Sequence, residues 1–358
     1  MLNRERLRAV LENMERRGLS QILVSDDDSL FYLLGCRIEA QERCGVLLIR
    51  SDGQVHAFMN ILFCFPPEEG LILHTYRDGE DVYAMIAAEL SAGKVGFDKN
   101  WPSRHTISIL QKRRDLIPVL GSEPLDLARM CKDEAEQELL RHAGQINDQA
   151  VAYGISRIAA GLAEAQLAGQ IDDYFLRSGG RQVGQYQVVC YGVNAAQPHH
   201  IPDGTLPQPG DAVLLDLVCP INGYWCDMPR TVFYRQVSAH HRAVYESVRR
   251  AQQAGIDAVR PGVRMREIDA AVRQVITEAG YGDAFITRTG HGIGLMVHEP
   301  PDVSAGCDIA AREGMVFSIE PGIYLPGDVG VRIEDLVIVT ADGCEVLTRY
   351  PKELQIVG

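Results

Sequence analysis

Two stretches of the sequence, PGDAVLLDLVCPINGYWCD (residues 209–227) and EGMVFSIEPGIYLPGDVGVRIED (residues 313–335), repeat one arrangement of glycines and acids. In each copy an acid follows a glycine after five intervening residues, and a second acid follows a later glycine after three. These acids are Asp216 and Asp227 in the first copy, and Glu320 and Glu334 in the second. The apolar runs before Asp216 and Glu320 are typical of buried strands. The repeat therefore predicts two related strand–loop–strand units.

The segments upstream of the two copies repeat as well. Gly161 and Gly179 bracket one helical pattern, LAEAQLAGQIDDYFLRSG, and Gly262 and Gly280 bracket another, VRMREIDAAVRQVITEAG. Both pairs of glycines lie 18 positions apart. A helix–helix–strand–strand unit that occurs twice predicts a pseudo-symmetric sheet covered by helices on one side.

The first part of the chain alternates helical and strand patterns. Helices are expected at residues 4–19, 80–93 and 103–116, and strands at residues 20–26, 44–50, 54–59 and 94–98. The turn SDG at residues 51–53 joins two of these strands as a hairpin. We expect a compact α/β unit without a constellation of catalytic side chains.

The pattern changes around GSEPLDLARMCKDEAEQELL (residues 121–140). Its proline suggests an extended segment from Gly121 to Leu127, and the charged residues that follow predict a long helix. A chain of 358 residues is too long for one ordinary core, so two domains are expected. We place an N-terminal domain at residues 1–128 and a C-terminal domain at residues 129–358, an α+β architecture overall.

Charge and cysteine usage narrow the class of protein. The net charge of −13 argues against a nucleic-acid or anionic-membrane surface, because either needs a basic patch. The N-terminal stretch MLNRERLRAVLENMERRGLS lacks the apolar region of a secretory signal, and no run approaches the ~18 apolar residues of a membrane span. The nine cysteines are scattered without a CxxC pair, which indicates reduced thiols in a cytoplasmic protein.

The four repeated acids need a physical explanation. A carboxylate that ends an apolar strand costs several kcal/mol to bury unless it is paired or bound to a metal. Four carboxylates facing one another could not all ionise without strong repulsion. Divalent cations remove that repulsion, and four carboxylates neutralise about two of them.

The stretch RTGHGIGLMVHEPP (residues 288–301) supplies a nitrogen ligand for such a site. Its glycines follow G-x-G-x-G rather than the dinucleotide-binding GxGxxG, so a nucleotide loop is not indicated. Four carboxylates and the imidazole of His291 form an oxygen-rich ligand set. This set suits Mn(II), Co(II) or Zn(II) in a two-metal site better than a structural zinc.

In combination, four motifs resemble the proline-specific metallopeptidases of the pita-bread fold, Xaa-Pro aminopeptidase and Xaa-Pro dipeptidase (prolidase). They are LLD…GYWCDMPRT, GHGIGLMVHEPP, FSIEPGIY and GVRIED. DSLFYLLG at residues 28–35 resembles that family's creatinase-type N-terminal domain. The resemblance implies this α/β domain followed by a pita-bread domain, a curved and mainly antiparallel sheet with pseudo-twofold symmetry covered by helices.

The resemblance also implies a role for each candidate site residue. The metal ligands would be Asp216, Asp227, His291, Glu320 and Glu334. Asp227 and Glu334 would bridge the two ions, Asp216 would complete one ion, and His291 and Glu320 would complete the other.

Catalysis and substrate binding would involve residues beside the ligands. Glu320 would act as general base. His298 and one histidine of QPHH, with His199 preferred over His200, would hold the oxyanion. Arg332 and Tyr324 match residues near the substrate.

One position departs from the family pattern. Pro229 stands in DMPRT where the family usually has Thr or Ser. Proline removes both a hydroxyl and a backbone donor. If that hydroxyl normally steadies Asp227, metal affinity or metal preference is expected to differ.

The implied function is a dinuclear-metal hydrolase that cleaves the peptide bond before proline through a metal-bridging hydroxide. Its partners would be short proline-containing peptides and a second copy in a homodimer, and manganese would be the first-choice ion. Dipeptidase and aminopeptidase activities both stay open. A metal-dependent amidohydrolase of a small non-peptide C–N substrate also stays open. A metal-free creatinase-type hydrolase and a non-catalytic pita-bread binding protein are disfavoured by the complete set of ligands.

Overall fold

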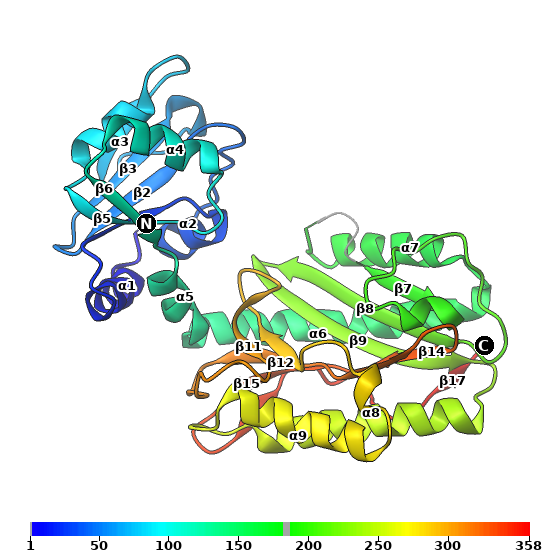
Figure 1. Cartoon of the computed structure of the whole chain (residues 1–358). Coiled ribbons are helices and arrows are strands. Elements are labelled where there is room, and N and C mark those ends of the chain that lie inside the picture. The colour runs from blue at the N-terminus through cyan, green and yellow to red at the C-terminus, as the bar shows by residue number, and fades with distance from the viewer. Residues whose placement is uncertain (1, 182–186) are drawn as a thin grey trace. The chain divides into compact units, whose positions relative to one another are not determined.

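The computed structural model describes residues 2–181 and 187–358. The chain divides into two compact units on either side of the bond between Arg129 and Met130 (Figure 1). Among the described residues, no helix combines the length and the apolar character that crossing a bilayer would require.

The N-terminal unit is built on a six-stranded mixed sheet in the order β4-β3-β2-β1-β5-β6. The predicted hairpin is the antiparallel pair β2–β3, whereas β3–β4, β1–β5 and β5–β6 are parallel. Its strands are β1 (Gln21–Val24), β2 (Val46–Arg50), β3 (Val55–Asn60), β4 (Ile72–Tyr76), β5 (Gly93–Phe97) and β6 (Leu116–Leu120). Its helices are α1 (Arg4–Arg16), α2 (Asp27–Leu34), α3 (Val82–Glu89) and α4 (Ser103–Lys112).

Several local predictions in this half are wrong, and one is the end of the helix expected at residues 80–93, which stops at Glu89. The helix expected to reach residue 116 ends at Lys112, because the backbone of Arg113 is extended, and the Arg113 side chain binds Asp115 and the carbonyl groups of Ala87 and Leu90. The segment expected to be extended from Gly121 to Leu127 instead begins helix α5 (Glu123–Met130). Pro124 lies in the first turn of this helix, where its missing N–H is not needed.

The C-terminal unit contains two larger sheets and a separate hairpin. The first sheet has the order β17-β9-β8-β7 and the second the order β11-β10-β12-β15-β16, while β13 pairs with β14. The first sheet uses β7 (Val188–Tyr191), β8 (Ala212–Ile221), β9 (Tyr224–Tyr234) and β17 (Ile356–Val357). The second uses β10 (Gly290–Gly292), β11 (Glu299–Val303), β12 (Val316–Ile319), β15 (Asp335–Val339) and β16 (Cys344–Val346), and the hairpin is β13 (Gly322–Leu325) with β14 (Val329–Arg332).

The two sequence copies differ in one respect. The first copy forms the continuous antiparallel hairpin β8–β9. In the second copy the strands are interrupted beside the acids, because Glu320 lies between β12 and β13 and Glu334 lies between β14 and β15. The interruptions leave both glutamates outside regular sheet ladders.

Helices α6 (Glu134–Arg157), α7 (Glu164–Arg177), α8 (Ala239–Ala258) and α9 (Met265–Glu278) pack on these strands. Figure 1 shows α6 running along β8 and β9. Its start is set by a capping box in which Asp133 accepts from the Glu136 N–H at 2.8 Å and Glu136 accepts from the Asp133 N–H at 2.9 Å. Apolar side chains of α6 and α7, including Val151 and Ile171, bury one face of the first sheet.

Candidate metal centre

Three of the expected ligands form a buried cluster. Asp227 comes from β9, His291 from β10, and Glu334 from the segment before β15. One ligand atom from each lies within 4.8 Å of the others, and all three residues are buried. The structure thus brings together residues from both sequence copies and from the glycine-rich segment.

The other two expected ligands border the same cluster. Glu320 Oε1 lies 3.3 Å from His291 Nε2, and Asp227 Oδ2 lies 3.6 Å from the same nitrogen. Asp216 on β8 lies close enough to raise the pKa of Asp227, and its carboxylate accepts a hydrogen bond from Arg332. All five side chains therefore meet at one place.

Burial and mutual repulsion change the protonation of these groups. Burial is the largest cause that raises the pKa of Asp227 and of Glu334 well above the usual range, and the neighbouring carboxylates add to it. Burial also raises the pKa of Glu320 to about 7, although the charge of Arg332 opposes the shift. Without a counter-charge this cluster cannot be fully ionised at neutral pH.

The tautomer of His291 leaves one ring nitrogen free to act as a ligand. Its Nδ1 lies 3.1 Å from the carbonyl oxygen of Gly292, so Nδ1 carries the proton and donates it. Nε2 is then the lone-pair nitrogen that faces Asp227 and Glu320. Burial lowers the pKa of His291 to about 4, so the imidazole is neutral at pH 7. A neutral imidazole held by its other nitrogen is the form that binds metals.

Three carboxylate oxygens in the cluster lack partners within the described part of the chain. They are Asp216 Oδ1, Asp227 Oδ1 and Glu334 Oε1, all of them buried. A buried oxygen without a hydrogen bond costs about 1–3 kcal/mol, and more when it is charged. Bound divalent cations would satisfy all three oxygens and the His291 lone pair, so the donor set fits metal ions.

A cavity of about 390 Å³ opens onto the acids. Its wall includes the side chains of Asp216, Asp227, His291 and Glu320, together with apolar residues such as Val188 and Val297. A pocket of this size with a few convergent polar groups suits a small ligand.

The two candidate oxyanion histidines both line the cavity. The ring of His298 packs edge-on against His291, with the centroids 4.3 Å apart. His199 and His200 both border the cavity, but His200 Nε2 lies 3.0 Å from Glu164 Oε2. Because His200 is tied to this buried carboxylate, His199 is the better candidate for contact with a substrate.

Arg332 and Tyr324 also lie in the cavity wall. Arg332 Nη1 donates to the Tyr324 hydroxyl at 2.6 Å, and Nη2 donates to Asp216 and to the carbonyl oxygen of Pro198. The guanidinium is therefore engaged with a carboxylate of the cluster.

Glycines in the His291 segment allow close backbone approach. A Cβ at Gly290 would lie 1.9 Å from the Ser318 carbonyl oxygen, and one at Gly292 would lie 2.3 Å from the Pro300 carbonyl oxygen. No side chain fits at either position without a backbone shift. The glycines allow the strand that carries His291 to pack directly against its neighbours.

Comparison with known proteins identifies the family. The model of metallopeptidase family M24 matches residues 138–341, and that of the Creatinase/Prolidase N-terminal domain matches residues 6–131. The chain belongs to metallopeptidase family M24. It is thus an enzyme, a metallopeptidase, and the predicted creatinase-type domain followed by a pita-bread domain is confirmed.

Relatives of this M24 enzyme align over nearly its whole length. The putative dipeptidase YkvY of Bacillus subtilis (strain 168) is 33% identical over 98% of this chain and 99% of its own. The Xaa-Pro dipeptidase of Lactobacillus delbrueckii subsp. lactis is 35% identical over 96% of both chains. The crystal structure of dipeptidase PepE from Mycobacterium ulcerans matches with a TM-score of 0.92 and 34% identity, covering 99% of this chain and 97% of that one.

The M24 domain also contains buried polar residues that the sequence reasoning missed. Glu164, fully buried, accepts from the backbone N–H groups of Tyr191 and Asp203 and contacts Asn194 and His200. These contacts hold the loop that carries His199. Glu164 lies inside one of the repeated helical patterns and reads there as an ordinary helical acid, so the sequence offered no signal.

The departure at Pro229 has a structural context in this M24 domain. Pro229 pairs with Asp216 across the β8–β9 hairpin. Its carbonyl oxygen accepts from Arg230 Nη1 at 3.0 Å and from the Glu334 N–H at 3.4 Å. The backbone at this position thus still links the two acidic strands, although the hydroxyl is missing.

Proposed function

We propose that this M24 metallopeptidase is an Xaa-Pro dipeptidase whose five-residue cluster holds two divalent cations, with manganese the first choice and cobalt or zinc as alternatives. The observation that carries the metal centre is the set of three unpartnered carboxylate oxygens beside the lone pair of a neutral imidazole. The ligands would be Asp216, Asp227, His291, Glu320 and Glu334.

Dipeptidase activity is favoured over aminopeptidase activity by the pattern of similarity. Relatives and structures named dipeptidase or Xaa-Pro dipeptidase reach 33–36% identity. The X-Pro aminopeptidase of Thermotoga maritima MSB8 is 25% identical, with a TM-score of 0.80. A homodimer stays a prediction from the family resemblance, and a cytoplasmic location stays a prediction from the scattered cysteines.

An X–Pro peptide bond is a tertiary amide without an N–H group, so its recognition cannot rely on a backbone donor of the substrate. When bound, divalent cations supply a nucleophile from water at neutral pH and polarise the scissile carbonyl. Glu320 accepts the proton of the attacking water and returns it to the proline nitrogen. Its raised pKa of about 7 in the metal-free protein shows how strongly the cavity disfavours an unpaired charge there.

The histidines stabilise the developing oxyanion. Burial lowers the pKa of His298 to about 4, so its ring is neutral at pH 7 and offers one N–H donor. His298 and His199 would direct their N–H groups to the substrate oxygen from the cavity wall. Arg332 orients Asp216 through its hydrogen bond, and Tyr324 supports Arg332.

The function can be tested with metal-depleted protein that is re-supplied with Mn²⁺, Co²⁺ or Zn²⁺. The substrates are an Xaa-Pro dipeptide, an Xaa-Pro-Xaa tripeptide and a dipeptide without proline. We expect cleavage of the Xaa-Pro dipeptide alone, and a calorimetric titration that shows two bound ions. Cleavage of the tripeptide would identify an aminopeptidase. Inactivity on every peptide with every metal would favour a non-peptide C–N substrate.

A further inference from the structure

We propose that Arg230, Asp335 and Lys352 form a joint that positions Asp227 and Glu334 opposite each other, so that the C-terminal segment of the chain helps to set metal affinity. The joint consists of these three side chains. The inference rests on the proposed metal centre, and the three are positioning residues because they act through their neighbours.

The joint lies where the two halves of the site meet. β9 belongs to one sheet and β15 to the other, and the candidate bridging acids Asp227 and Glu334 come from these two sides. Arg230 on β9 crosses between them: its Nη1 donates to the Glu334 carbonyl oxygen and its Nη2 donates to Asp335 Oδ1 at 2.7 Å. One guanidinium therefore binds both the residue that carries a candidate ligand and the residue after it.

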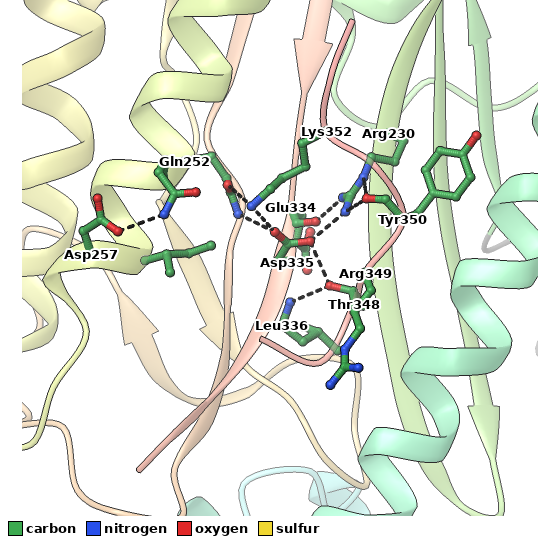
Figure 2. A network of polar contacts seen from close by, with 12 residues as sticks. Arg230, Gln252, Asp257, Glu334, Asp335, Leu336, Thr348, Arg349, Tyr350 and Lys352 are labelled. Atoms are coloured by element: carbon green, nitrogen blue, oxygen red, sulfur yellow. Dashed lines mark hydrogen bonds and ion pairs between the residues drawn. The ribbon is translucent and has the colours of Figure 1, made fainter. Parts of the chain in front are cut away.

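The carboxylate of Asp335 accepts hydrogen bonds from four side chains. Figure 2 shows its carboxylate surrounded by side chains from several segments. Oδ1 accepts from Arg230 and from Thr348 Oγ1 at 2.9 Å, and Oδ2 accepts from Gln252 Nε2 at 3.0 Å and Lys352 Nζ at 2.7 Å. Asp335 is completely buried and Arg230 is 1% exposed. Ions this deeply buried hold their geometry only while every partner is present.

The C-terminal segment locks the joint. Lys352 Nζ contacts Asp335 Oδ2 and also donates to Gln252 Oε1 at 3.0 Å. The Tyr350 carbonyl oxygen accepts from Arg230 Nε at 3.2 Å and Nη2 at 2.8 Å. Asp148 on α6 in turn accepts from the backbone N–H of Tyr350 at 2.8 Å. A segment that contributes no candidate ligand is thereby bonded to Asp335, next to Glu334, and to Arg230, three residues after Asp227 on β9.

Two further hydrogen bonds connect β9 to the backbone of the segment that carries Glu334. Thr231, next to Arg230, donates through its hydroxyl to the Arg332 carbonyl oxygen at 3.1 Å and accepts from the Arg332 N–H at 3.2 Å. The strand segments carrying Asp227 and Glu334 are therefore connected by the side chains of two consecutive residues, Arg230 and Thr231. A change in the joint would alter the separation of the two carboxylates.

The test compares Lys352→Met with Arg141→Met in the full-length protein. Lys352 is partly exposed, so its loss is the mildest change to the joint. Arg141 pairs with Glu345 at 2.9 Å and serves as the matched control, since this half-buried ion pair also fastens the C-terminal region but lies outside the joint. The Kd for Mn²⁺ is measured by titration calorimetry, and the unfolding temperature is measured without metal.

We expect Lys352→Met to weaken Mn²⁺ binding about tenfold, within the range typical of residues that orient metal ligands, and Arg141→Met to leave the Kd unchanged. Lys352→Arg should restore most of the affinity because it keeps the charge near Asp335. Asp335→Asn and the double variant Asp335→Asn/Lys352→Met should lose the same Mn²⁺ affinity. The second change adds nothing because both substitutions break the same joint.

A purely structural role would lower the unfolding temperature of the Lys352 variant while its Kd stayed within threefold of the parent value, and that result would overturn the joint. If the unaltered chain binds none of Mn²⁺, Co²⁺ and Zn²⁺, the metal centre itself is wrong. Failure of the joint and failure of the metal centre therefore give different experimental results.

Discussion

We propose the tasks of the acids in the cluster from the groups that each of them contacts. Glu320 faces the His291 lone pair and the cavity, which suits proton transfer. Asp216 accepts a hydrogen bond from Arg332, and Asp216, Asp227 and Glu334 each keep one oxygen without a partner in the described structure. The residue types alone could not assign these roles, because Asp and Glu offer the same oxygens and only the partners distinguish them.

Substitutions should separate metal binding from turnover. Glu334→Gln removes a charged oxygen from the cluster, so we expect loss of bound metal and a drop in kcat of at least 10³-fold, on the scale of lost catalytic metal and transition-state stabilisation.

His298→Ala should keep the metal and lower kcat about 10²–10³-fold, since it removes only an oxyanion donor. Metal content by elemental analysis and steady-state kinetics check both. Release of the ions by His298→Ala would show that its assigned role is wrong.

Metal affinity should depend on pH. In the metal-free protein the pKa of Glu320 is about 7 against an ordinary 4.5, so protons compete with cations below neutrality. We expect the Kd for Mn²⁺ to weaken about tenfold in total as pH falls from 8 to 6, because one proton with a pKa of about 7 binds over this range. Calorimetry in buffers of different ionisation enthalpy would count the released protons. A Kd that is constant over this range would contradict the assignment.

The raised pKa of Glu320 also determines how the stability of the protein changes with pH. A folded-state pKa above the unfolded value stabilises the metal-free fold fully below pH 4.5, and that contribution is lost as pH rises through about 7. The rise in unfolding temperature on adding Mn²⁺ should therefore be larger at pH 8 than at pH 6. Thermal scans at the two pH values check this.

Among the secondary-structure elements, the sequence predicted the strands with long hydrophobic patterns. It did not predict two edge strands or the interruptions beside the glutamates. The repeated glycine–acid spacing located β8 and β9 because their hydrophobic runs are long and buried. The edge strands β4 and β6 were missed although their sequences, ILHTY and LIPVL, are largely apolar, and in β6 Pro118 argues against a strand. The interruptions beside Glu320 and Glu334 could not be foreseen, since they depend on contacts between distant segments.

The strand β10 tolerates no side chain at Gly290. Gly290→Ala would place a Cβ against the backbone of Ser318, so we expect a loss of about 1–3 kcal/mol or more in the free energy of unfolding, and a displaced His291. Metal affinity should fall together with stability. Gly306→Ala is the control, because a Cβ at Gly306 meets nothing within 4 Å. Chemical denaturation and metal titration of both variants provide the measurement. If both variants lost the same stability and metal affinity, a steric clash at Gly290 would not be the cause.

At the scale of the whole molecule, the chain is two units with separate cores, and the five proposed metal ligands all belong to the second. The change of pattern near residues 121–140 is the basis of the domain boundary that we predict at residue 129. The joint of Arg230, Asp335 and Lys352 could not be predicted, because its partners lie 105 and 17 residues apart along the chain. Only the folded topology brings them together.

Metal binding should therefore stabilise one unit selectively. Ligand at 100 times its Kd adds about 2.7 kcal/mol to the folded state, a shift of roughly 5–10 °C for a unit of this size. We expect calorimetric scanning with and without EDTA to show one transition that moves with Mn²⁺ and one that does not. Two transitions that move equally would mean that the units unfold together.

A ribosome synthesises Asp227 long before it reaches Glu334, and the bond between Arg230 and the Glu334 carbonyl spans 104 residues. At roughly 5–20 residues per second, the nascent chain waits about 5–20 s between the two halves of the cluster. During that interval the first half has no counterpart with which to capture cations. Loading of the proposed site with metal would therefore begin only once translation has delivered the closing strands.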